Sequence, residues 1–386
     1  MVKKKRIDDG SILIVAGENS GEKYGASLVY QFKKINPLFT FFGIGGKQMS
    51  AEGVEIISPM EGLSVVGAIE IISHLPRIKR IFDRIKRETL IRRPVASVLI
   101  DSPDFNIRLA KILKKLSIPV LYYISPTVWA WRKGRLKTIK KTVDKMLLIF
   151  PFEERIYESR QIPAVYVGHP LKERVKISLT KEEFFEKHRL DPEKKLITVL
   201  PGSRKSEIKY HLPVLVKSIQ KILKEYPVQS VLVLAENLNR NMLSDYISPD
   251  HDHIKIITDD NYEAIASSDV VLSSCGTANL EAALLETPLI SFYRLSPFTY
   301  YAGVRFIRIK NYSIVNILVG EKIIPELIQR HFTSENIYKE TKKIFDSAEI
   351  RSEMISNFKK IKNILGTKRA SPNAARELEK LISSKK

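Results

Sequence analysis

The chain has 386 residues, of which 44% are hydrophobic and 28% charged, and this length predicts two domains rather than one. The composition is typical of a folded globular protein and excludes a disordered one. A single cysteine excludes an internal disulfide framework and fits a reducing cytoplasm. Residues 1–6 are basic, but Asp8 and Asp9 follow, and no apolar run approaches the ~20 residues that cross a bilayer. We therefore expect neither export nor a membrane span.

The formal net charge of +21 implies anionic partners. Nucleic acid, acidic lipid headgroups and small phosphorylated substrates would all fit this charge. The sequence has no zinc-finger spacing, no basic heptad region and no aromatic motif of the RNP type. These absences argue against a nucleic-acid partner.

Strand and helix patterns alternate along the chain. Apolar strand patterns occur at 11–16, 41–46, 95–100, 119–124, 146–150, 164–167, 196–200, 231–235, 254–258, 270–272 and 288–293. Helical patterns lie between them and fill the chain from 333 onward. This alternation predicts two parallel sheets flanked by helices. We expect one domain over 1–168, a second over 169–345, and a helical tail over 346–386 that could pack back on the first.

The sequence Pro-Gly-Ser-Arg at 201–204 follows a buried strand and opens a helix. Gly202 lets the backbone approach a ligand, Ser203 can cap the helix, and unpaired amides of the first turn attract anions. Arg204 adds a planar fork that suits two phosphate oxygens. An ordinary turn with a solvated arginine explains this stretch equally well. A second turn of the same kind at 273–281, in the same half of the chain, favours the anion site.

The strand at 95–100 delivers Asp101 and Asp104 at its carboxyl end, where open α/β sheets bind ligands. A carboxylate there is a candidate general base for an attacking hydroxyl. The loop after the first strand, 17–22, lacks the G-x-G-x-x-G spacing of a nucleotide loop. Because Glu18 and Glu22 would repel a diphosphate, this loop suits a sugar hydroxyl or a structural role.

Three further segments each allow two interpretations. Residues 62–93 combine an apolar stretch with a basic helix, which is typical either of a membrane-surface helix or of an ordinary amphipathic helix with a solvated basic face. Trp129 and Trp131 stand beside basic residues and could stack on bases, but their place after a strand favours a cleft wall. His169 is either catalytic or, in the turn-like Gly-His-Pro, a structural hinge, and we favour the hinge.

At this point several motifs become recognisable together. They are the segments 16–22, 100–106, 125–132, 168–170 and 200–204, Gly67 with Glu70, 276–278 with 280–281, and 293–294. In unbroken order from about 11 to about 330, they resemble lipid-A-disaccharide synthases. The segments Asp-x-Pro-Asp-Phe-Asn and Trp-Ala-Trp-Arg are specific to that family.

The resemblance implies a GT-B glycosyltransferase, with two Rossmann-like doubly wound domains facing across a cleft, no cofactor and no metal requirement. The implied reaction inverts the anomeric carbon and joins UDP-2,3-diacylglucosamine to 2,3-diacylglucosamine 1-phosphate, forming a β-1,6 disaccharide and UDP. The implied location is the cytoplasmic face of the inner membrane, where the anionic surface would hold the protein peripherally. No nucleic-acid partner is implied, and the oligomeric state is left between a monomer and a homodimer.

The resemblance also assigns site residues. Asp101 matches the family's essential strand-end aspartate and Arg204 its essential arginine, so we expect a proton acceptor and a stabiliser of the departing diphosphate. The expected donor site comprises Gly202, Ser203, Arg204, Gly276, Thr277, Ala278, Glu281 (on the ribose) and Asn316. The expected acceptor side comprises Glu18, Ser20, Gly21, Asp104, Asn106, Trp129 and Arg132.

Three positions depart from the family pattern. Glu22 stands where an aspartate is usual, Cys275 precedes Gly276 where serine is usual, and Val315 replaces a common proline. The nearest alternative is another GT-B-like enzyme, a UDP-N-acetylglucosamine 2-epimerase or a lipid-linked N-acetylglucosaminyltransferase, from which different first loops and no Trp-Ala-Trp-Arg segment are expected. A basic nucleic-acid-binding protein would explain the charge but neither strand-turn-helix site.

Overall fold

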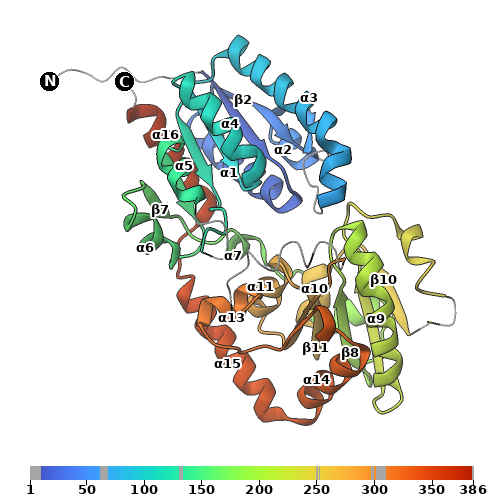
Figure 1. The fold of residues 1–386 in the computed structure, drawn as a ribbon. Coiled ribbons are helices and arrows are strands. Elements are labelled where there is room, and N and C mark those ends of the chain that lie inside the picture. The colour runs from blue at the N-terminus through green and yellow to red at the C-terminus, as the bar shows by residue number, and fades with distance from the viewer. Residues whose placement is uncertain are drawn as a thin grey trace. The chain divides into compact units, whose positions relative to one another are not determined.

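The structure, a computed structural model, describes residues 10–60, 68–129, 134–248, 251, 253–296, 300 and 310–384, without the side chains of 68–75. The described residues form two compact units. The first unit holds those up to Glu173 together with those from Leu365 onward, and the second holds those from Arg174 to Ile364. Each unit has its own parallel sheet (Figure 1).

The first unit is built on a seven-stranded parallel sheet in the order β3-β2-β1-β4-β5-β6-β7. The strands are β1 (Gly10–Ala16), β2 (Phe39–Gly45), β3 (Val54–Pro59), β4 (Ala96–Ile100), β5 (Val120–Tyr123), β6 (Lys145–Leu148) and β7 (Ala164–Tyr166). From the central β1–β4 pair, the chain adds β2 and β3 on one side and β5, β6 and β7 on the other. In this pair Ala16 lies opposite Ile100. That pair is the topological switch point, where doubly wound sheets bind their ligands.

Helices cover both faces of this sheet. One core lies under α1 (Asn19–Ile35), α2 (Lys47–Ala51) and α16 (Ala370–Ser384). The other lies under α3 (Ala68–Arg92), α4 (Pro103–Lys115), α5 (Arg135–Thr142) and α6 (Glu153–Glu158). Along β1, Ile12 and Ile14 face the first core, while Leu13 and Val15 face the second. Burial on both faces is why these strands are near-continuous apolar runs.

The last helix, α16, packs on α1 within the first unit (Figure 1). The segment that leads into it is held by the end of β7: the Tyr166 hydroxyl donates to the Leu365 carbonyl at 2.6 Å, and Lys368 Nζ donates to the Tyr166 carbonyl at 3.0 Å. The preceding helix, α15 (Ala348–Ile364), belongs to the second unit.

Gly168 is tightly confined by this returning segment. Its φ is +108°, and a Cβ there would lie 2.3 Å from the Lys368 carbonyl oxygen. We expect Gly168→Ala to destabilise the protein by about 3 kcal/mol, because it combines backbone strain with a clash against backbone. Urea unfolding should show this loss. Gly366→Ala is the matched control, since Gly366 has φ +59° but no neighbour within 4 Å of a Cβ; an equal loss in both variants would contradict the clash.

The second unit has a six-stranded parallel sheet in the order β10-β9-β8-β11-β12-β13. Its strands are β8 (Lys195–Leu200), β9 (Val228–Val233), β10 (Ile254–Ile257), β11 (Val270–Ser274), β12 (Leu289–Tyr293) and β13 (Glu326–Ile328). Its helices include α8 (Lys181–Lys187), α9 (Lys205–Leu223), α10 (Asn261–Ala266), α11 (Thr277–Leu284), α13 (Ile314–Val319) and α14 (Ser334–Asp346). The switch point here is the β8–β11 pair, in which Leu200 lies opposite Ser273.

The predicted strands are all present, with bounds that differ by at most three residues at either end. The sequence patterns missed β3 and β13, which lie at sheet edges. Within the segment 62–93, helix α3 begins at Ala68 and runs through Pro76.

The second half of α3 behaves as an ordinary amphipathic helix. Ile81 and Ile85 are buried in the core of the first unit, with Ile78 and Phe82 packed against it. The apolar residues between 78 and 85 are therefore packed on the core, and the exposed part of this half consists mostly of basic residues, together with Leu90 and Ile91 near the end of the helix. Among the helices of the described residues, none has the length and apolar character to cross a membrane.

Candidate active site

Asp101 directly follows β4 at the switch point of the first unit. It has φ +48°, and Ser102 after it has φ +41°. Two consecutive non-glycine residues in the left-handed region are strained, and such strain persists only where the surroundings hold it. The strain therefore marks this turn as a place where backbone geometry has been fixed against local preference.

Hydrogen bonds hold the Asp101 backbone on both sides. Its N–H donates to the Tyr123 carbonyl at 3.0 Å, and its carbonyl accepts from the Tyr122 hydroxyl at 2.6 Å and from Asn106 Nδ2 at 2.9 Å. Burial raises the pKa of Tyr122, so its hydroxyl keeps its proton and remains a donor. The side chain of Asp101 thus starts from a fixed, partly exposed point, as a positioned base requires.

The other two polar residues of this segment lie differently from what we expected. Asn106 is fully buried and donates to the carbonyls of Ile100 and Asp101, so its amide nitrogen supports the turn. Asp104 is exposed and forms an ion pair with Arg135 at 2.5 Å. The predicted acceptor role of both residues has no direct support in these contacts.

The turn after β1 lies beside Asp101 in the sheet, because β1 pairs with β4. Glu18 occupies the N-cap position of α1, and Ser20 and Gly21 lie in its first turn. A Cβ on Gly21 would lie 3.4 Å from Ile100, so α1 packs closely on β4 there. The Glu22 carboxylate is buried and accepts from the Gln48 N–H at 2.9 Å, which caps α2. Glu22 is therefore structural, in line with our second interpretation of this loop.

Aromatic residues also follow β5 and β6, at the same edge of the sheet as Asp101. Trp129 packs edge-on against Phe152, with ring centroids 5.6 Å apart. Arg132 and Trp131 lie outside the described residues, so their predicted roles stay predictions.

His169 is buried against Phe150, accepts the Leu171 N–H at 3.2 Å, and burial lowers its pKa to about 3. A neutral, enclosed imidazole supports the hinge interpretation over a catalytic one.

Glu153 is a buried carboxyl in this region, near Ser125 and Trp129, and burial raises its pKa to about 8. Because its folded pKa exceeds the unfolded value of 4.5, the native state binds the extra proton and stability falls as pH rises between these values. We expect a loss of about 4 kcal/mol from pH 5 to 8 that Glu153→Gln abolishes. Urea unfolding across this range should show it, with the exposed Glu158→Gln as control. Parallel pH slopes for wild type and Glu153→Gln would contradict the buried acid.

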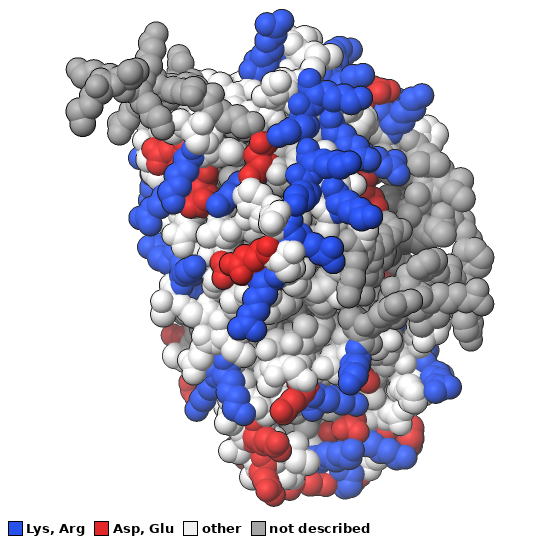
Figure 2. Space-filling view, turned by 60° about the vertical axis from the view of Figure 1, so that its left-hand side comes forward, with Lys and Arg blue, Asp and Glu red and all other residues white. Residues whose placement is uncertain are grey.

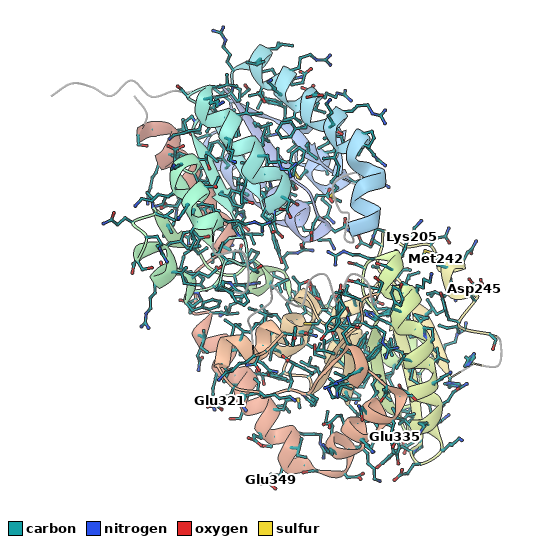
Figure 3. The ribbon with its side chains drawn as sticks, viewed as in Figure 1. Lys205, Met242, Asp245, Glu321, Glu335 and Glu349 are labelled. Atoms are coloured by element: carbon teal, nitrogen blue, oxygen red, sulfur yellow. The ribbon has the colours of Figure 1, made fainter. Side chains whose placement is uncertain are left out.

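In the second unit, the predicted anion turn after β8 has the expected shape. Gly202 has φ +119°, which favours glycine, and α9 begins at Lys205, labelled in Figure 3. The predicted cap is wrong, however. The N-cap residue is Arg204, and Ser203 lies before it with its carbonyl accepting from Asn237 Nδ2 at 2.9 Å.

The amides of this turn are not unpaired, which corrects a second expectation. The buried Glu207 carboxylate accepts the N–H groups of Ser203 and Arg204, at 2.8 and 3.2 Å through Oε2. Its Oε1 accepts from Arg204 Nη1 at 3.1 Å and from the Tyr293 hydroxyl at 2.9 Å. An anion at this turn would therefore meet the partly exposed Arg204 guanidinium and not these two amides.

The second predicted turn, after β11, is more open. Gly276 and Thr277 are exposed, Ala278 is partly exposed, and Gly276 at the N-cap of α11 has no side chain that could cap it. Glu281, one turn along, lies beside Tyr262, and burial together with this neighbouring charge raises the pKa of Tyr262. Burial also raises the pKa of Cys275 to about 12, so its thiol is protonated.

Asn316 is fully buried with its amide used within the chain. Its Oδ1 accepts the N–H groups of Ile323 and Ile324, and its Nδ2 donates to the Ile324 carbonyl and to Glu326. With two bonds on each amide atom, Asn316 has no atom left for a donor substrate. The contacts instead give it the task of holding the segment that leads into β13.

One group among the described residues has metal-ligand spacing: His188, Asp259 and Asp260. Lys187 Nζ lies 2.5 Å from Asp260, and His188 Nε2 lies 2.8 Å from the same oxygen. Lys187 pairs with both Asp259 and Asp260, so we assign the group to an ion-pair cluster.

Sequence reasoning assigned no role at the site to three supporting residues: Tyr122, Glu207 and His211. Glu207 had a usable signal, since a glutamate three residues after the N-cap is the pattern of a capping box. Tyr122 and His211 sit inside apolar runs, where their polar contacts leave no pattern.

Both units show the strand order of Rossmann folds, and known structures share the architecture. The UDP-GlcNAc 2-epimerase from Neisseria meningitidis, solved with UDP-GlcNAc, aligns with a TM-score of 0.64 at 14% identity, over 96% of this chain and 98% of that chain. The calicheamicin glycosyltransferase CalG4 aligns with a TM-score of 0.59 at 12% identity, over 97% of this chain and 98% of that chain. The fold is therefore that of the GT-B class, as predicted.

The family follows from the sequence comparisons. The profile of lipid-A-disaccharide synthetases matches residues 12–378. The lipid-A-disaccharide synthase of Solibacter usitatus is 37% identical over 94% of this chain and 95% of its own length. The chain belongs to the lipid-A-disaccharide synthase family and is a glycosyltransferase that forms a lipid A disaccharide, which confirms the resemblance.

Proposed function

We propose that the enzyme transfers 2,3-diacylglucosamine from UDP-2,3-diacylglucosamine to 2,3-diacylglucosamine 1-phosphate. Family membership supports a UDP-sugar donor and a lipid acceptor. The observation that carries the site assignment is the strained, triply hydrogen-bonded Asp101 backbone at the switch point of the first sheet.

In the proposed step, the acceptor's 6-hydroxyl oxygen attacks the anomeric carbon of the donor sugar from the face opposite UDP. Asp101 accepts the hydroxyl proton as the new C–O bond forms. The bond between the anomeric carbon and the diphosphate oxygen breaks, and its electron pair leaves with UDP. Because the attack comes from the face opposite the leaving group, the anomeric configuration is inverted and the product has a β-1,6 linkage.

Arg204 in the second unit is assigned to the departing diphosphate, whose negative charge grows in the transition state. Its guanidinium is partly exposed, with a side-chain exposure of 33%, and is oriented by the Glu207 carboxylate. The exposed turn of Gly276, Thr277 and Ala278 is the candidate for further phosphate contacts, and Glu281 for the ribose hydroxyls. Amides at an uncapped helix start favour such anions.

The test of this function is UDP release from UDP-2,3-diacylglucosamine with and without 2,3-diacylglucosamine 1-phosphate. We expect release only when both are present, with one disaccharide formed per UDP. Release that does not depend on the acceptor, or an epimerised donor, would overturn the proposed reaction.

We also propose peripheral attachment to the cytoplasmic face of the inner membrane, where acylated substrates would lie. Lysine and arginine side chains gather in a band on the face shown in Figure 2. Helix α3 carries exposed basic residues at positions that include Arg77, Lys79, Arg80, Arg84, Lys86 and Arg87. Basic residues near an anionic surface each contribute about 1 kcal/mol of attraction.

We expect binding to vesicles of anionic phospholipid at low salt and release at high salt, because salt screens charge attraction. A triple change of Arg80, Arg84 and Arg87 to Glu, on the exposed face of α3, should weaken binding at least ten-fold. Sedimentation with vesicles measures both effects, and neutral phosphatidylcholine vesicles are the control. Binding that is equal at low and high salt would refute the electrostatic attachment.

A further inference from the structure

Two buried side chains of α9, Glu207 and His211, lie one helical turn apart. Their exposures are 6% and 0%. Residues four apart share one face of a helix, and both of these side chains reach back to the turn that precedes α9. Neither side chain has been assigned a contact with substrate.

Glu207 forms hydrogen bonds both to the turn and to Arg204. The carboxylate accepts four hydrogen bonds: from two turn amides, from the Arg204 guanidinium and from the Tyr293 hydroxyl. A Cβ on Gly202 would lie 2.2 Å from Glu207 Oε2, so the turn wraps closely around this carboxylate. The direction of Arg204 is thereby set by a side chain that is itself fixed.

His211 provides a second link from the same helix face. Its Nδ1 lies 2.7 Å from the Pro201 carbonyl, and its Nε2 lies 3.0 Å from the Arg294 N–H. Because the carbonyl can only accept and the N–H can only donate, Nδ1 carries the proton and Nε2 is the acceptor. Burial lowers the pKa of His211, in agreement with this neutral form, and the rings of Phe292, Tyr293 and Phe332 enclose it.

The two links join elements that are not neighbours in the sheet. Pro201 and Arg204 follow β8, Tyr293 ends β12 and Arg294 follows it, and β11 separates these strands. Glu207 contacts Tyr293, while His211 contacts Arg294. Together they tie the turn after β8 to the end of β12 at two successive points.

We propose that Glu207 and His211 are positioning residues for the donor's diphosphate. They hold the turn after β8 against the end of β12 and aim the Arg204 guanidinium at the phosphate oxygens. This inference rests on the proposed function, in which Arg204 binds the leaving diphosphate. It assigns neither residue a contact with substrate.

Glu207→Gln is the near-isosteric test. A glutamine amide places an NH₂ group against either the turn amides or the Arg204 and Tyr293 donors, so one set of hydrogen bonds is lost whichever way it points. We expect UDP to bind about ten-fold more weakly, as measured by calorimetry. In an Arg204→Ala background the same change should weaken binding less than two-fold, because a residue acting through Arg204 loses its effect with it.

His211 is tested by two variants that each retain one link. His211→Asn can still donate toward Pro201, and His211→Gln can still accept from Arg294. Each should raise the donor KM several-fold and leave the acceptor KM unchanged. Ser218→Ala is the matched control, since Ser218 is a buried residue of the same helix whose hydroxyl donates to the Val214 carbonyl within that helix, and it should leave both values unchanged.

The outcomes separate this inference from the proposed reaction. Wild-type UDP binding by Glu207→Gln, or additive losses in the double variant, would overturn the positioning role while leaving the synthase activity intact. UDP binding with the expected non-additive losses, but without disaccharide formation, would uphold the positioning role and reject the proposed reaction. A wild-type protein that does not bind UDP would overturn both.

Discussion

Replacing Asp101 by asparagine should lower kcat by about a thousand-fold, within the range that a general base contributes. Asparagine is the informative substitution because residue 101 has φ +48°, a conformation that asparagine tolerates and alanine does not. The backbone hydrogen bonds from Tyr122 and Asn106 would remain, since both end on the carbonyl of residue 101. The loss would then report the missing proton acceptor alone.

The control for this variant is UDP affinity, which should equal that of the wild type, because Asp101 has no assigned contact with the leaving group. Asn106→Ala is a second probe. It removes the two hydrogen bonds to the Ile100 and Asp101 carbonyls and should lower kcat less than Asp101→Asn does, by misplacing the base without deleting it. Turnover of Asp101→Asn within two-fold of the wild type would exclude the base assignment.

Replacing Arg204 by alanine should lower kcat about a hundred-fold or more, as expected when one donor to a developing anion is removed. UDP binding should weaken as well, because the guanidinium meets phosphate oxygens in both the ground state and the transition state. Arg204→Lys keeps the charge but not the planar fork, so we expect it to recover only part of the loss. Steady-state kinetics combined with UDP calorimetry measure both effects.

Unfolding by urea serves as the control, because Arg204→Ala removes one donor to the buried Glu207 carboxylate and leaves the two turn amides and the Tyr293 hydroxyl in place. The matched control for Arg204→Ala is Lys205→Ala, which removes the next basic side chain in the sequence. If Lys205→Ala costs as much activity as Arg204→Ala, the effect is one of general charge, and the specific role of Arg204 fails.

The sequence was sufficient for most of the fold because the central strands are buried on both faces and are followed by a small-residue turn or a helix. Val98 and Ile100, for example, lie in one core while Leu99 lies in the other, which produces the continuous apolar run that predicts a parallel strand. The strands β3 and β13 were missed because β3 is interrupted by Glu55 and Ser58 and β13 spans only Glu326–Ile328, so neither forms a continuous apolar run. The position of Asp101 followed from the rule that ligands bind at the carboxyl ends of such strands.

The fine structure of the donor turn could not be derived in the same way. The motif at 201–204 located the turn and Arg204, but which groups satisfy its amides depends on a side chain one helical turn away. Asn316 illustrates the same limit: a motif match cannot distinguish an amide that binds a ligand from one whose four bonds end within the chain. Long-range hydrogen bonds of this kind leave no periodic signal in a sequence.

The most direct measurement compares UDP binding and disaccharide formation in three proteins: the wild type, Asp101→Asn and Arg204→Ala. If one carboxylate receives the proton and one guanidinium holds the leaving group, Asp101→Asn will bind UDP as tightly as the wild type yet form almost no disaccharide, and Arg204→Ala will lose both. Disaccharide formation at the wild-type rate by Asp101→Asn, or wild-type UDP affinity in Arg204→Ala, would contradict that division of roles.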